Sequence, residues 1–157
     1  MEGTLITQES RIPSGCLVPD LWSSAAGDEF PVAKQQHAFD LVFDLYKDDA
    51  SAPVSGTWTI MRPPKAGVIT NVQAWEAGVG TNANNNTVDV HKNGSTVLTT
   101  PITFNNGDTA NLMKSGTLTS SPLAFAADDR IAAVIVKHAS NDGVGLKVRI
   151  RGYYIGF

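Results

Sequence analysis

The chain has 157 residues, enough for one domain with a buried core. Its formal net charge is −3 and it has no long basic run, which argues against a nucleic-acid partner. One cysteine allows no internal disulfide, and no stretch approaches the roughly 20 apolar residues of a membrane-spanning helix. Hydrophobic residues make up 42% and charged residues 17%, with Thr, Ser, Asn and Gly plentiful. This composition is typical of an all-β domain.

No basic start followed by an apolar run opens the sequence, so we expect the protein to be made in the cytoplasm without a signal peptide. Residues 1–36 lack helical or strand periodicity and are interrupted by proline and glycine. They still carry large apolar side chains, which a disordered tail would normally lack. These are Leu5, Ile6, Ile12, Leu17, Val18, Leu21 and Trp22. We predict an extended N-terminal arm that contacts its own domain or, as we favour, a neighbouring subunit or partner surface.

Strand patterns begin directly after the arm. Residues 37–46 alternate, with Phe39, Leu41 and Phe43 on one side and Asp40 and Asp44 on the other, which predicts a strand with one core face. Residues 57–61 predict a second strand. Residues 67–76 predict a third, which we expect to have neighbours on both sides because each of its faces carries apolar groups. One face is predicted to hold Val68, Thr70, Val72 and Ala74, and the other Ile69, Asn71, Gln73 and Trp75.

A hairpin at residues 87–100 is the clearest local signal. Asn93-Gly94 lies between β-branched runs and predicts a two-residue type I′ turn, because both central positions need a positive φ. That turn sets His91 opposite Thr96 and Lys92 opposite Ser95. The apolar face then holds Val88, Val90 and Val97, and the solvent face holds Asp89, His91, Thr96 and Thr100.

The remaining chain predicts an irregular excursion at 101–121, a short strand within 117–125, a central strand at 130–138 and a closing strand at 144–154. About eight strands without a helical pattern predict an antiparallel β-sandwich of jelly-roll type over residues 37–157, preceded by the arm at 1–36. In a jelly roll the first and last strands commonly lie side by side. This arrangement would set Asp40 and Asp44 opposite Arg149 and Arg151.

Four runs resemble a small β-sandwich module of tailed-phage virion proteins, which include head decoration and fibre proteins. The runs are 66–75 (AGVITNVQAW), 87–97 (TVDVHKNGSTV), 123–131 (LAFAADDRI) and 148–152 (VRIRG). The resemblance covers roughly residues 37–157 and brings no catalytic residues with it. It implies a structural virion protein, most like a capsid decoration (cement) protein on the outer surface of the head. Its partner would be the major capsid protein, and it would form a homo-oligomer, with a trimer favoured.

An alternative within the same resemblance is a tail or head fibre module that binds a host-surface glycan. Trp75 and Tyr153 lie on faces that also carry polar groups, and we expect them to contact a sister subunit or, in the alternative, a glycan. Asp89 and His91 share one face and would need a third ligand to hold a metal ion, so we predict no metal site and no cofactor. No acid–base pair or nucleophile lies in a recognisable motif, so we expect a protein without enzymatic activity.

Overall fold

The computed structural model describes residues 36–45, 52–81, 85–138 and 142–155. These residues belong to the second of two units into which the chain divides, Lys34–Phe157. They form ten strands: β1 (Gln36–Asp44), β2 (Gly56–Met61), β3 (Gly67–Gly78), β4 (Asn86–Lys92), β5 (Ser95–Thr96), β6 (Ile102–Phe104), β7 (Lys114–Gly116), β8 (Leu123–Phe125), β9 (Ile131–Val136) and β10 (Val144–Ile155). The described part of the chain holds no helix that could cross a membrane. The predicted arm lies outside the described residues.

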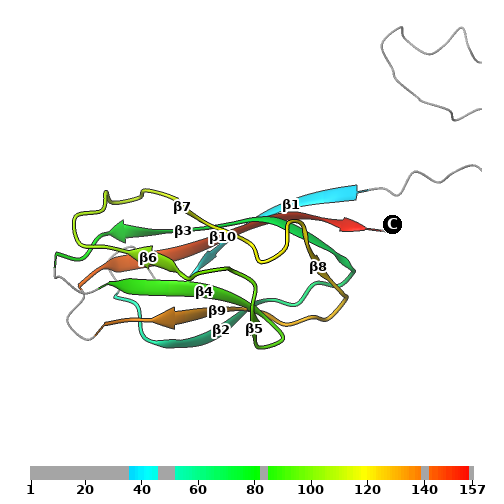
Figure 1. Cartoon of the computed structure of the whole chain (residues 1–157), viewed down its shortest axis with the longest axis horizontal. Helices are drawn as coiled ribbons and strands as arrows, with labels where there is room; N and C mark the ends of the chain where they lie inside the picture. The colour runs from blue at the N-terminus through cyan, green and yellow to red at the C-terminus, as the bar shows by residue number, and fades with distance from the viewer. Residues whose placement is uncertain (1–35, 46–51, 82–84, 139–141, 156–157) are drawn as a thin grey trace, which may run out of the picture. The chain divides into compact units, whose positions relative to one another are not determined.

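Two antiparallel sheets form the two layers visible in Figure 1. The sheet that we call the β10 sheet has the order β1-β10-β3-β7, with β8 also paired to β3. The β9 sheet has the order β2-β9-β4-β5, with β6 also paired to β4. The chain crosses from one sheet to the other between β1, β2, β3 and β4 in turn, and the last strand, β10, pairs with the first. This topology confirms the predicted β-sandwich of jelly-roll type.

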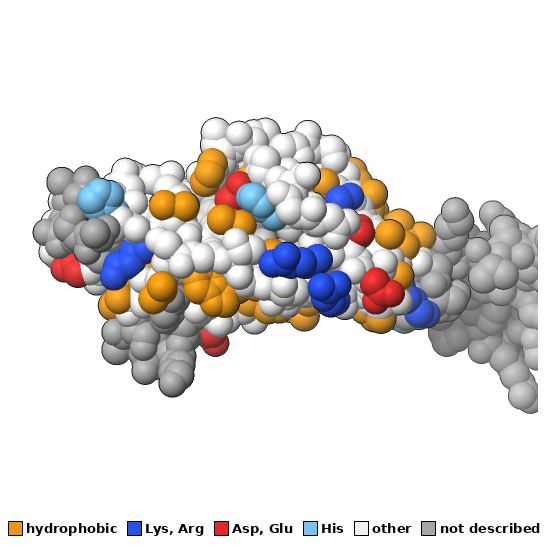
Figure 2. All heavy atoms as spheres, turned by 90° about the horizontal axis from the view of Figure 1, so that it is seen from below, with side chains coloured by type: hydrophobic (Ala, Val, Ile, Leu, Met, Phe, Trp, Pro, Cys, Tyr) orange, Lys and Arg blue, Asp and Glu red, His pale blue; other side chains and the backbone are white. Residues whose placement is uncertain are grey.

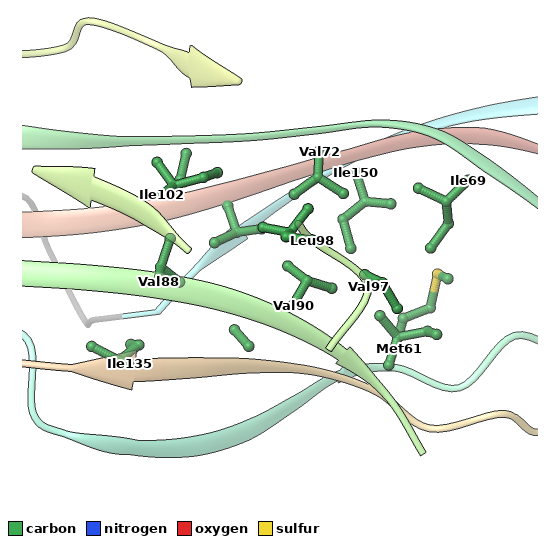
Figure 3. Close-up of a cluster of buried hydrophobic side chains, with 14 of the residues drawn as sticks. Met61, Ile69, Val72, Val88, Val90, Val97, Leu98, Ile102, Ile135 and Ile150 are labelled. Carbon is green, nitrogen blue, oxygen red and sulfur yellow. The ribbon is translucent and has the colours of Figure 1, made fainter. Parts of the chain in front are cut away.

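The core lies between the two sheets and is built from alternate residues of their strands. Figure 3 shows side chains from both layers meeting there. Side chains with 0% or 1% exposure include Ile69, Val72, Val88, Val90, Leu98, Ile135 and Ile150. Trp58 packs against this cluster from β2 and is partly buried. Because alternate residues point into this core, the residues between them point outward, and the outer face of each sheet is available for contacts with other molecules.

The predicted β4–β5 hairpin is confirmed. Asn93 and Gly94 have φ values of 53° and 91°, as a type I′ turn requires. His91 is paired with Thr96, and the Val97 N–H donates a hydrogen bond of 2.8 Å to the Val90 carbonyl oxygen. The turn residues are therefore sufficient to fix the register of β4 with β5.

One face assignment in β3 is wrong. The register between β3 and β10 shifts where Arg151 is paired with Asn71 but Gly152 is paired with Ile69, which leaves Thr70 as an extra residue. A bulge of this kind inverts the alternation on one side of it. Ile69 therefore packs in the core cluster with 0% exposure, on the face predicted for Val68, and Val68 is also buried, with 6% exposure, but lies outside that cluster.

The prediction of an irregular excursion at 101–121 is also incomplete. Within it, β6 pairs with β4 and β7 pairs with β3, and each strand has three residues. Three residues are too few to establish a period of two in the sequence. A turn lies at Asn106-Gly107 within this segment, with a φ of 83° at Gly107.

Candidate partner-binding surface

The outer side of the β10 sheet carries the strongest set of side chains for contact with another molecule, and we call it the β10-sheet face. It consists of the outward residues of three neighbouring strands. They are Ala38, Asp40, Val42 and Asp44 of β1, Lys147, Arg149, Arg151 and Tyr153 of β10, and Asn71, Gln73 and Trp75 of β3. Their positions follow from the registers, which pair Val42 with Arg149 and Arg149 with Gln73.

Asp40 joins the two arginines at the centre of this face. Arg149 Nε donates a hydrogen bond of 2.6 Å to Asp40 Oδ1, and Arg151 Nε donates one of 3.2 Å to Asp40 Oδ2. The hydrogen bond from Arg149 lowers the pKa of the Asp40 carboxyl, and the charges of both arginines act in the same direction. The predicted meeting of Asp40 with Arg149 and Arg151 is thus confirmed, and the guanidinium groups are held at defined positions.

The matching prediction for Asp44 is wrong. The register of β1 with β10 places Asp44 opposite Lys147, and their side chains form an ion pair of 3.3 Å. The sequence pattern identified the correct two strands but placed Asp44 two residues too far along β10.

Trp75 and Tyr153 both lie on the β10-sheet face, but far apart. Trp75 is opposite Lys147, whereas Tyr153 is opposite Ala38 and Val68. Lys147 and Tyr153 are six residue steps apart on β10, which corresponds to about 20 Å at the usual rise of a strand. The two aromatic rings therefore cannot stack on one sugar ring together. Each remains a predicted contact on its own.

Exposed apolar side chains lie on and beside this face. Val42 is 51% exposed, and Leu112 and Met113, in the segment before β7, are 50% and 47% exposed. Met113 Sδ lies 3.9 Å from Arg149 Nη1. Arginine, methionine and aromatic residues are the types enriched at protein–protein interfaces. The β10-sheet face therefore carries residue types that are enriched at protein–protein interfaces, Arg149, Arg151, Trp75 and Tyr153 with Met113 beside them, next to the charged residues Asp40, Asp44 and Lys147.

The β9 sheet has a different outer face. Figure 2 views the molecule from the side of β9 and β2, where most side chains are neither acidic nor basic. The Asp89 carboxylate there accepts hydrogen bonds from the Val90 N–H at 2.7 Å and from Thr96 Oγ1 at 2.9 Å, and its other oxygen lies 3.0 Å from His91 Nε2. His91 Nδ1 lies 3.1 Å from the Gly94 carbonyl oxygen.

These contacts tie Asp89 and His91 to their own hairpin. Within the described residues, no group of three or more His, Cys, Asp or Glu could hold a metal ion, so the structure brings no third ligand to this pair. These contacts stabilise the hairpin and its register, since they join side chains of β4 and β5 to each other and to the turn.

A buried acid, Glu76, was not singled out by the sequence patterns. Its side chain is 1% exposed, and Oε1 accepts a hydrogen bond of 2.9 Å from Asn86 Nδ2. Oε2 has no hydrogen-bond partner among the described residues. Burial raises the pKa of Glu76, although the hydrogen bond from Asn86 and the charge of Lys114 oppose that effect. The pair links β3 to β4 across the two sheets, and no substrate could reach this carboxyl from solvent.

The arm residues predicted to bind a partner lie outside the described residues. They are Leu5, Ile6, Ile12, Leu17, Val18, Leu21 and Trp22. Their contacts stay predictions.

Comparisons with known proteins give two distant structural likenesses. One is to a chain of the cyanophage Pam1 capsid asymmetric unit, with 15% identity, 85% of this chain and 93% of that chain covered, and a TM-score of 0.49. Another is to the EclA C-terminal domain, a sugar-binding protein, with 17% identity, 99% of each chain covered and a TM-score of 0.29. No protein-family model and no curated protein matches the chain. At these levels of identity and structural similarity, neither likeness indicates a function for this chain.

Proposed function

We propose that the protein is a structural component of a phage virion that decorates the outer surface of the head. It binds the major capsid protein through its N-terminal arm and through the sandwich, and it has no enzymatic activity. The observation that carries the proposal is the β10-sheet face, where Arg149, Arg151, Met113 and Trp75 give a jelly roll an interface-like surface. The resemblance of residues 37–157 to virion modules supports the same role.

The physical design suits a lattice of repeated binding sites. An extended arm reaches up to about 3.3 Å per residue, far enough to contact a capsid subunit that the sandwich does not touch. Contacts that are weak singly add through effective concentration when one molecule carries several of them, and a homo-oligomer, with a trimer favoured, multiplies them again.

Removal of residues 1–35, which ends just before β1, is expected to leave a folded sandwich that no longer coats capsids. We expect the apparent affinity for capsids prepared without the protein to fall by at least about 100-fold, because the second point of attachment is lost. Co-sedimentation of full-length and truncated protein with such capsids measures the effect, and circular dichroism verifies that the truncated protein is folded. Undiminished coating by the truncated protein would contradict the proposal.

A matched pair of substitutions separates apolar anchoring from the mere presence of an arm. We expect the combined change Leu21→Ser and Trp22→Ser to weaken capsid binding, because buried aromatic and aliphatic anchors dominate interface energies. The combined change Ser23→Ala and Ser24→Ala alters two adjacent positions without removing an apolar anchor and is expected to leave binding unchanged. Equal effects of the two pairs would argue against anchoring at this point of the arm.

Trp75 favours one second candidate function, a fibre module that binds a host-surface glycan. Its ring is partly exposed on the β10-sheet face opposite Lys147, and Gln73 lies on the same strand two residues away. A glycan array with the full chain tests this candidate. Reproducible binding that is lost on Trp75→Ala would favour it over the capsid role, whereas an array without binding would leave the capsid role as the better account.

A further inference from the structure

Strand β1 is the longest edge strand among the described strands. It has nine residues and pairs only with β10 in the described part of the chain. The opposite edge of the same sheet is made of β7 and β8, which have three residues each. At the edge of the other sheet, β2 carries a register shift between Thr59 and Met61 and is followed by Pro63-Pro64. Short strands, bulges and prolines protect sheet edges from pairing with other chains, and β1 has none of these devices.

The backbone groups that β1 presents at this edge can be identified. The Leu45 N–H, one residue beyond β1, donates a hydrogen bond of 3.0 Å to the Leu146 carbonyl oxygen. Backbone groups of successive residues point to alternate sides of a strand, and the register of β1 with β10 has no shift. The odd-numbered residues of β1 therefore bond to β10. The N–H and C=O groups of Ala38, Asp40, Val42 and Asp44 point toward the free edge.

The inward side chains of β1 are symmetric about Leu41. Phe39 and Phe43 lie two residues before and after it, and all three are only partly buried although they pack against the core. Phe39 already contacts Tyr154, with ring centroids 5.0 Å apart. A second β1 strand related by a two-fold axis through Leu41 would set Phe39 opposite Phe43 of the second copy. It would cover the apolar side chains that the sheet edge leaves partly exposed.

Repulsion between the carboxylates of β1 disfavours the neighbouring axes and so favours the axis at Leu41. With the axis at Leu41, Asp40 lies opposite Val42 of the second copy, and Asp44 lies opposite Ala38. An axis through Asp40 would place two Asp40 carboxylates opposite each other, and an axis through Val42 would place Asp40 opposite Asp44. Like charges directly opposite each other destabilise a strand pair.

From these observations we propose that β1 pairs antiparallel with β1 of a second copy of this chain, around a two-fold axis at Leu41. The pairing joins two β10 sheets into one continuous sheet through hydrogen bonds of the even-numbered residues. It rests on β1 alone and does not depend on the proposed capsid role. It is also compatible with a trimer, because a two-fold contact of this kind would link neighbouring trimers.

Two substitutions at one exposed position test the contact. Val42 is 51% exposed and points away from the core, so a charged residue there is expected to leave the fold intact. Val42→Asp would place a carboxylate opposite Asp40 of the second copy, twice by symmetry. Val42→Lys would place a cation there instead. Sedimentation of the full chain in reducing buffer, at concentrations up to about 1 mM, the weak end of protein association, measures the mass of each form.

We expect the mass of the natural chain to rise with concentration by a two-fold step. The dissociation constant of that step is expected to increase at least tenfold in Val42→Asp and to be unchanged or lower in Val42→Lys. Val42 is paired with Arg149 of its own chain, so the two charges affect the melting temperature differently, and circular dichroism verifies that both variants are folded. A natural chain without a two-fold step over this range would overturn the proposal, and so would a two-fold step that Val42→Asp leaves unchanged.

A disulfide test locates the axis independently. In a Cys16→Ser background, Leu41→Cys would place two sulfurs across the axis at a non-hydrogen-bonded pair. Its Cα separation of about 4.5 Å is within the range that disulfides bridge. Ala38→Cys is the control, because its symmetry mate would lie about 20 Å away by strand rise. We expect oxidation to yield a covalent dimer of the Leu41→Cys protein alone. No dimer, or equal dimer from both variants, would refute an axis at Leu41.

Discussion

Replacing Gly152 by alanine is expected to destabilise the sandwich by about 3 kcal/mol, the upper part of the usual range for overpacking. A Cβ atom at Gly152 would lie 2.0 Å from the Val68 carbonyl oxygen and 2.6 Å from Cζ of the Phe39 ring. The oxygen belongs to the backbone of β3 beside the bulge at Thr70, so it cannot move without shifting the pairing of β3 with β10. Glycine is required here by close approach of the two central strands.

Chemical unfolding in urea measures this change, and Gly78→Ala is its control. Gly78 lies at the other end of the same strand pair, where an added Cβ would meet only a methyl group of Val144, at 2.8 Å. We expect a loss below about 1 kcal/mol there, because a side chain can move aside and alanine reduces the freedom of the unfolded chain. Equal losses at the two glycines would contradict the role assigned to the bulge.

Glu76→Gln is expected to change the pH dependence of stability. The folded-state pKa of Glu76 is raised above its ordinary value of 4.5, chiefly because burial disfavours the charged carboxylate. The stability that the neutral carboxyl provides is therefore fully present below pH 4.5 and is lost as the pH rises through the folded-state pKa. Glutamine keeps an acceptor for Asn86 Nδ2 and never ionises. We expect the variant to match the natural protein near pH 4 and to exceed it by about 1–3 kcal/mol near pH 8.

Asp40→Asn is the control, because its effect on the pH dependence of stability is expected to have the opposite sign. The pKa of Asp40 is lowered below 3.8, chiefly by its hydrogen bond from Arg149, so its contribution is present above that pH and is lost as the pH falls through the lowered value. We expect Asp40→Asn to be less stable than the natural protein at neutral pH and to approach it in acid. Free energies of unfolding at a series of pH values separate the two effects. A Glu76→Gln curve parallel to that of the natural protein would contradict the account of Glu76.

Most of the fold follows from local signals in the sequence. The type I′ turn at Asn93-Gly94 fixes the β4–β5 register, because only residues that tolerate a positive φ suit both positions. The alternation of Phe39, Leu41 and Phe43 predicts a strand with one core face, and the apolar residues on both faces of β9 predict a central strand, which the sheet order confirms. The pairing of β1 with β10 follows from the usual pairing of first and last strands in a jelly roll.

The differences arise where tertiary contacts override a local pattern. The bulge at Thr70 inverts the faces of β3, and nothing in the local sequence distinguishes an extra residue from a regular one. The alternation of Val72, Ala74 and Glu76 places Glu76 on the inner face, so the sequence did contain a signal for this buried residue. Its partner Asn86 belongs to a run of three asparagines that is typical of a loop, and only pairing of β4 with its neighbours reveals it as a buried strand residue.

The surface chemistry was predictable in part. Asp40 and the two arginines could be brought together from strand order alone, whereas the position of Asp44 required the register. Trp75 and Tyr153 could be assigned to outward positions, but their separation depends on how β3 and β10 are aligned. The proposed two-fold contact at β1 likewise needs the topology, because the sequence does not say which strand ends a sheet.

Electron cryomicroscopy of capsids decorated with the full chain tests the central claim most directly. We expect residues 1–35 to run over the major capsid protein, with Leu5, Ile6, Leu21 and Trp22 against its surface and the sandwich standing outside the shell. Arms that instead fold onto their own sandwiches without touching a capsid subunit would contradict it, as would capsids that fail to bind the protein at all.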